Sequence, residues 1–145
     1  MKLTIEQALH QGIEAHKEGN LEAAERLYRA ILQSQPAHSD ANHNLGVLAV
    51  SVNKMELALT SFKTALRANP KEAQFWLSYI DALIKGEQFD TAKNVLAEAK
   101  KVGVVREKVD ALEAKLNESV LSDQFGAKKN LTLKKKRKKI SENKK

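Results

Sequence analysis

The chain has 145 residues, of which 25 are lysine or arginine and 18 are aspartate or glutamate, so its formal net charge is +7. It contains no cysteine, which excludes disulfide bonds and thiolate chemistry. The length predicts a single domain, and the absence of a long apolar run predicts no membrane span.

Residues 1–38 predict a helical hairpin. Thr4 and Gln7 have the spacing of a capping box, which predicts that the first helix begins beside them. Gly19 and Asn20 interrupt the helical pattern, and a second helix is predicted from about Leu21 to Ser34. Pro36 cannot continue this helix, so the hairpin ends there.

Residues 39–106 repeat this pattern twice. Helices are predicted over about 39–52 and 55–68, and then over about 72–85 and 89–102. Gly86 follows Lys85, and Gly103 comes two residues after Lys101; both predict helix ends. Beyond them, apolar residues recur at steps of three and four and predict an amphipathic terminal helix over about 105–121: Val105, Val109, Leu112, Leu116 and Val120.

The hairpins share a constant period of about 34 residues, which is typical of stacked helix-turn-helix units. The residues that recur with this period are Gly12 and Gly46, Ala24, Ala58 and Ala92, Tyr28 and Phe62, and Pro36 and Pro70. Small residues allow two helices to approach closely, and the aromatic residues, with Trp76, are expected to fill the larger gaps between hairpins.

On these residues the chain resembles the tetratricopeptide repeat family over residues 5–106, in units 5–38, 39–72 and 73–106. The third unit departs from the pattern, with Ile80, Leu96 and Val104 at the glycine, aromatic and proline positions. The resemblance implies an all-α fold: a right-handed superhelical stack of three hairpins with a C-terminal capping helix. We expect this domain to span 1–127.

The resemblance also implies a binding groove, lined by the first helix of each hairpin. Such a groove suits an extended peptide or a partner helix. The residues that we expect to form it are Leu9, His10, Ile13, Asp40, His43, Asn44, Val47, Leu77, Ser78 and Asp81.

Asn44 lies where the repeat arrays of O-GlcNAc transferases have an asparagine that pairs with ligand backbone. An amide both donates and accepts, so it can hold a peptide of any sequence. The carboxylate clamp of chaperone-adaptor repeats is matched only by Asn44, because Leu9, Ile13, Gln74 and Ser78 replace its other members.

Catalytic and metal sites are not predicted. The sequence contains no phosphate-binding loop and no nucleophile motif, so we expect neither a catalytic residue nor a cofactor. His38, Asp40 and His43 straddle the start of a predicted helix and lack the geometry of a helical ligand pair, so no metal site is predicted either.

The positive charge is concentrated at the C-terminal end. Residues 128–145 contain 10 lysines or arginines and 1 glutamate, or +9, which leaves −2 for residues 1–127. Few apolar residues interrupt this segment, so we expect a disordered tail. Its basic run is a candidate polyanion-binding or nuclear-import segment: Lys134, Lys135, Lys136, Arg137, Lys138 and Lys139.

These observations predict a non-catalytic scaffold that holds a peptide or helix of another protein in its groove. Two alternatives stay open: the recognition part of a larger bacterial glycosyltransferase or sulfotransferase, whose repeats these resemble, and a scaffold whose tail binds nucleic acid. We expect a monomer or weak homo-oligomer with no membrane partner, located in the cytoplasm, or in the nucleus if the source is eukaryotic.

Overall fold

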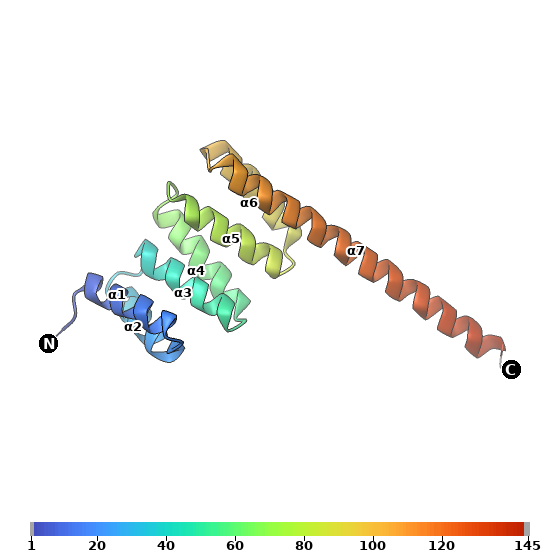
Figure 1. Ribbon diagram of the computed structural model, residues 1–145, viewed down its shortest axis with the longest axis horizontal. Helices are drawn as coiled ribbons and strands as arrows, with labels where there is room; N and C mark the ends of the chain where they lie inside the picture. Colours follow the sequence, from blue (N-terminus) through green and yellow to red (C-terminus); the bar gives the residue numbers. More distant parts are fainter. Residues whose placement is uncertain (1, 144–145) are drawn as a thin grey trace.

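The computed structural model contains seven helices and no strand within residues 2–143, and its side chains are described for residues 2–125. The helices pair into three hairpins followed by one long helix (Figure 1). Their bounds are α1 Ile5–Lys17, α2 Leu21–Ser34, α3 Ser39–Ser51, α4 Met55–Ala68, α5 Ala73–Lys85, α6 Phe89–Val102 and α7 Arg106–Asn143. The predicted hairpins are therefore confirmed to within one or two residues at each helix end.

The helix ends follow from local side-chain chemistry. Thr4 caps α1 through the predicted capping box: the backbone N–H of Gln7 donates to Thr4 Oγ1 at 3.1 Å, and the N–H of Thr4 donates to Gln7 Oε1 at 2.9 Å. The side chain of Asn20 caps α2 in the same way, accepting from the N–H of Ala23. At the end of α6, Gly103 adopts a left-handed conformation with φ of 86°.

Glycine and an aromatic ring hold the first two hairpins together. A Cβ atom added at Gly12 would lie 2.5 Å from Cε1 of Tyr28, and one added at Gly46 would lie 2.5 Å from Cε1 of Phe62. Both rings are fully or almost fully buried. The rings therefore fill space within their own hairpin, directly over the glycine, and the ring of Tyr28 also packs with the core of the second hairpin.

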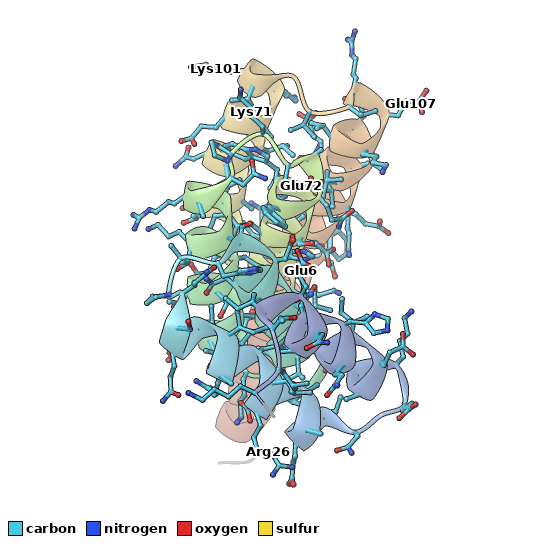
Figure 2. The ribbon with its side chains drawn as sticks, turned by 90° about the vertical axis from the view of Figure 1, so that its left-hand side faces the viewer. Glu6, Arg26, Lys71, Glu72, Lys101 and Glu107 are labelled. Atoms are coloured by element: carbon cyan, nitrogen blue, oxygen red, sulfur yellow. The ribbon has the colours of Figure 1, made fainter. Side chains whose placement is uncertain are left out.

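The seven helices form two rows. In the inner row, α1, α3, α5 and α7, each helix contacts the next. In the outer row, α2, α4 and α6, no two helices bring their Cα atoms within 8 Å of each other in the described residues. In Figure 2 the stack runs from α1 and α2 at the bottom to α6 and α7 at the top, with Lys101 on the side of the outer row and Glu107 on the side of α7. Because only the inner helices approach so closely, the stack curves around the inner row, which is the face where a groove was expected.

The first part of α7 caps the third hairpin as predicted. Val109 and Leu116 are each 1% exposed and pack into the core formed by α5 and α6. The positions of α7 that match the hairpin-facing positions of earlier inner helices are polar, for example Asp110 and Asn117, which correspond to Trp76 and Leu83. A further helix is therefore not needed to cover this face.

The C-terminal end of α7 differs from the sequence-based expectation. The terminal helix was expected to end near residue 121, but α7 continues to Asn143 and projects past the stack (Figure 1). The chain has no proline after Pro70 and is rich in lysine here, so no residue in this part stops the helix. Side chains beyond Phe125 lie outside the described part, so the predicted tail disorder, the boundary at 127 and the basic site remain predictions.

Candidate functional site

The ten residues expected in the groove all lie on inner-row helices, three on α1, four on α3 and three on α5. None of them belongs to the buried core, since each side chain is either partly or fully exposed. Asn44 is partly exposed and Val47 is 39% exposed, so both are accessible to a ligand. The ten residues are therefore accessible on inner-row helices, and their role as a ligand-binding groove stays a prediction.

A shallow depression of about 370 Å³ lies between α1 and α3. Three of the expected groove residues line it: Ile13, Asn44 and Val47. His16 and Lys17, which were not predicted as site residues, add basic side chains to one side. The depression therefore combines apolar walls, one amide and nearby positive charge.

Tyr28 reaches this depression from the outer row. Its hydroxyl group is buried and has no hydrogen-bond partner among the described residues, and burial raises the pKa of the hydroxyl. A protonated hydroxyl without a partner is costly in a core. The sequence did not suggest Tyr28 as a site residue, because its ring already serves to pack against Gly12.

His43 and Ser78 join α3 to α5. His43 Nε2 lies 2.8 Å from Ser78 Oγ, and the side-chain amide of Gln74 donates to the same oxygen at 3.1 Å. The imidazole packs near the rings of Phe75 and Phe62, with centroid distances of 4.9 and 5.5 Å. Sequence reasoning placed these two residues at different repeat positions and did not predict their contact.

Desolvation lowers the pKa of His43 and outweighs three influences that raise it: the Asn44 side chain and the charges of Asp40 and Glu72. The imidazole is therefore held neutral. No carboxylate hydrogen bonds to His43 within the part of the chain that the structure describes, so the pair lacks the third group of a hydrolytic triad. The contact links two inner helices.

Asp81 is engaged by its own chain. Lys115 of α7 donates to Asp81 Oδ1 at 2.6 Å, and Lys85 lies 2.9 Å from Oδ2. Burial raises the pKa of Asp81, but the hydrogen bonds and charges of the two lysines outweigh burial and lower it. The carboxylate of Asp81 is therefore neutralised by two lysines at this end of the groove.

The repeat period continues into α7 and supplies a fourth inner-row helix. Lys108, Leu112 and Lys115 stand one repeat after Gln74, Ser78 and Asp81. The apolar stripe of residues 105–120 is compatible both with a capping helix and with the first helix of an incomplete fourth repeat, and these three positions have the repeat register of the second alternative.

The histidines do not form a metal centre in the described residues, where no group of three potential ligands gathers. His38 instead caps α3, and its Nδ1 accepts from the backbone N–H of Ala41 at 3.1 Å. The same part of the chain has no helix with the length and apolarity to cross a bilayer. The side chains of the basic run at 134–139 lie outside the described residues.

Comparison with known proteins identifies the repeats. Two family models described as tetratricopeptide repeat match residues 9–59 and 49–116, which together cover all three hairpins and the start of α7. The chain is 27% identical over 90 residues to cellulose synthase operon protein C of Komagataeibacter xylinus. The matched residues make up 62% of this chain and 7% of that protein.

Solved structures show the same fold. A mutant O-GlcNAc transferase of Thermobaculum terrenum matches 80% of this chain and 23% of its own, with a TM-score of 0.67 and 26% identity. The TPR2B domain of yeast Sti1, in a pHsp70 complex, matches 79% of this chain and 96% of its own, with a TM-score of 0.71 and 17% identity. With its period, its hairpins and these matches, the chain belongs to the tetratricopeptide repeat family.

Proposed function

We propose that the chain is a non-catalytic scaffold that binds an extended peptide or a helix of another protein along the inner row. The observation that carries this proposal is the depression between α1 and α3, where Ile13, Asn44 and Val47 lie together. An amide between two apolar side chains can hold a peptide group while apolar ligand side chains cover Ile13 and Val47.

A ligand backbone accounts for the polar groups of this surface. The Asn44 side chain contributes to raising the pKa of the neighbouring His43. An amide has two N–H donors and an accepting oxygen, so part of its hydrogen-bonding capacity is left for a ligand. Tyr28 lines the same depression, but its hydroxyl is buried and therefore not within reach of a ligand. A bound peptide group close to Asn44 would pair with the remaining donor and acceptor of this amide. Lys17, which pairs with Glu14 at 3.6 Å, and His16 place basic side chains at one side, where a ligand carboxylate would compete with Glu14.

The test is a selection of binding peptides from a displayed random library with the immobilised full chain. Asn44→Ala should weaken the selected peptides about 5-fold, equivalent to about 1 kcal/mol for one hydrogen bond. Asn117→Ala is the matched control, because Asn117 is an exposed residue of α7 outside the lining of the depression. Peptides that bind both variants as tightly as the unmodified chain would remove Asn44 from the site.

A second candidate function is recognition on behalf of a larger transferase. It is favoured by the likeness to the O-GlcNAc transferase, of which the chain matches only 23%. In that case the inner row would present a protein substrate to a catalytic domain. An assay of this chain with sugar-nucleotide donors should then show no transfer, while a protein substrate of the full enzyme should bind the inner row.

A further inference from the structure

A second cavity opens on the other side of the stack, between the outer-row helices α4 and α6. Its volume is about 430 Å³, close to what one or two large side chains occupy. Leu66, Trp76 and Tyr79 form its apolar floor, and each is between 6 and 9% exposed. We refer to this cavity as the outer groove.

The outer groove differs from the equivalent place one repeat earlier. Thr91 lines it, whereas the residue at the same repeat position of the second hairpin, Leu57, packs into the core between the first two hairpins. A threonine is too short to fill the same space. A hollow on the surface of α2 is lined by that helix alone, whereas the outer groove is lined by residues of both α4 and α6.

The rim of the outer groove is mainly basic. Lys63 and Arg67 stand on α4, and Glu98 is the single acidic lining residue. Neither Lys63 nor Arg67 takes part in an ion pair within the side chains that are described. The groove therefore favours an apolar segment that carries a carboxylate.

The chain itself contains a segment of this chemistry. On α7, Leu121 is 65% exposed and Phe125 is 72% exposed. Glu118, also exposed, precedes them by three and seven residues, so all three side chains lie on one face of the helix. We refer to Glu118, Leu121 and Phe125, which lie where α7 leaves the stack and not at its last residue, as the α7 tip.

The α7 tip cannot reach the outer groove of its own chain. Helix α7 is continuous from Arg106 to Asn143 and is fixed to α5 and α6 by Val109 and Leu116, and it then runs away from the stack (Figure 1). Phe125 lies nine residues beyond Leu116, or about 14 Å along the helix. Any groove that it fills must belong to another molecule.

We propose that the outer groove binds the α7 tip of a second copy of this chain. Phe125 and Leu121 enter the apolar hollow above Trp76 and Tyr79, and Glu118 meets Arg67 and Lys63 on the rim. Two copies that exchange tips form a closed dimer with two-fold symmetry. The contact is small, so the dimer is weak and depends on concentration.

The test is sedimentation equilibrium of the full chain up to about 1 mM, a range that populates small interfaces. We expect a reversible monomer–dimer equilibrium. Phe125→Glu and Arg67→Glu should each weaken association at least 10-fold. Lys93→Glu is the matched control, since Lys93 is an exposed residue of α6 outside the groove lining and should leave the equilibrium unchanged.

A mixture of the two variants separates this contact from a direct pairing of two α7 helices. The Phe125→Glu chain keeps an intact groove and the Arg67→Glu chain keeps an intact tip, so the mixture should associate more strongly than either variant alone. The proposal would be overturned if the chain is still monomeric at the highest concentration, or if Arg67→Glu leaves its association unchanged. Binding of another protein in the groove would not rescue it.

Discussion

The first two hairpins and the third solve the same packing problem with different residues. In the first two, a glycine lies under an aromatic ring, so closely that an added Cβ would sit 2.5 Å from a ring carbon. In the third, the same two positions hold Ile80 and Leu96, which are 0% and 4% exposed. The glycine and the ring are therefore replaced together in the third hairpin, because the core must be filled without overlap.

The largest effect should come from breaking this pairing in one hairpin. Gly46→Ile places a branched side chain against the ring of Phe62 and should cost about 3 kcal/mol of unfolding free energy. Adding Phe62→Leu imports the pair of the third hairpin and should recover part of that loss, with a coupling energy of about 1–3 kcal/mol. Urea unfolding of the two single variants and the double variant measures it.

The control for this cycle is the same cycle at distant positions. Gly46→Ile combined with Leu96→Phe joins residues of different hairpins, and their effects should add. If Phe62→Leu gives no recovery beyond additivity, glycine and ring are not one packing unit.

A smaller effect is expected at the junctions between hairpins, where two repeats use different donors at one position. Trp76 Nε1 donates to the carbonyl of Pro70 at 2.7 Å, and Asn42 Nδ2, one repeat earlier, donates to the carbonyl of Pro36 at 3.0 Å. Trp76→Phe should cost about 2 kcal/mol, since the Pro70 carbonyl loses its donor, and Asn42→Ala at least as much, because Asn42 Nδ2 also donates to the carbonyl of His38 at 3.0 Å.

The two variants should behave alike in urea unfolding if the hydrogen bond is what the repeats share. Asn94→Ala, on the exposed surface of α6, controls for loss of an amide. A loss at Trp76 with none at Asn42 would mean that the bulk of the indole, and not its donor, holds the junction.

These junctions mark the limit of sequence-based prediction for this fold. Helix bounds, the glycine positions and the burial of Trp76 followed from periodicity, because each depends on residues within one repeat. The hydrogen bonds to the two proline carbonyls could not be predicted from periodicity, because repeat position alone does not fix side-chain direction. The contact of His43 with Ser78 was missed for the same reason, since it joins two different repeat positions.

The expected end of the terminal helix, near residue 121, differs from the Asn143 end of α7 for another reason. The apolar stripe predicts how far the helix is buried, which is to about Val120, but burial and helix length are separate properties. The ion pair of Asp81 with Lys115 was likewise not predicted from the sequence, although the two residues are one repeat apart.

His43 should give the junction of the second and third hairpins a dependence on pH. The pKa of His43 is lowered in the folded state, so the unfolded chain binds the proton more tightly. Stability should be complete above the unfolded pKa of about 6.5 and should fall as the pH drops toward the folded pKa, by at most about 1.4 kcal/mol per pH unit.

Urea unfolding between about pH 5 and about pH 8 tests this expectation. His43→Leu should flatten the slope, whereas His10→Leu, at the exposed neighbouring position on α1, serves as the control. An unchanged slope in His43→Leu would assign the pH dependence to other groups.

The smallest effects should come from the turns inside the hairpins. The same repeat position is left-handed in all three: Gly19 has φ of 81°, and Asn53 and Glu87 both have φ of 59°. A left-handed backbone strains most side chains, asparagine less than glutamate. Glu87→Gly should therefore stabilise the third hairpin by about 0.5–1 kcal/mol, and Asn53→Gly should change little.

Gly19→Ala is the reverse experiment and isolates the backbone term. A Cβ at Gly19 would meet no atom within 4 Å, so the expected loss of about 1 kcal/mol cannot come from a clash. Thermal unfolding of the three variants should therefore order them as Glu87→Gly, Asn53→Gly and Gly19→Ala, from most to least stable. If Glu87→Gly is not the most stable of the three, the side chain of Glu87, and not its backbone, decides the stability of the third turn. The third hairpin would then differ from the first two in its turn as well.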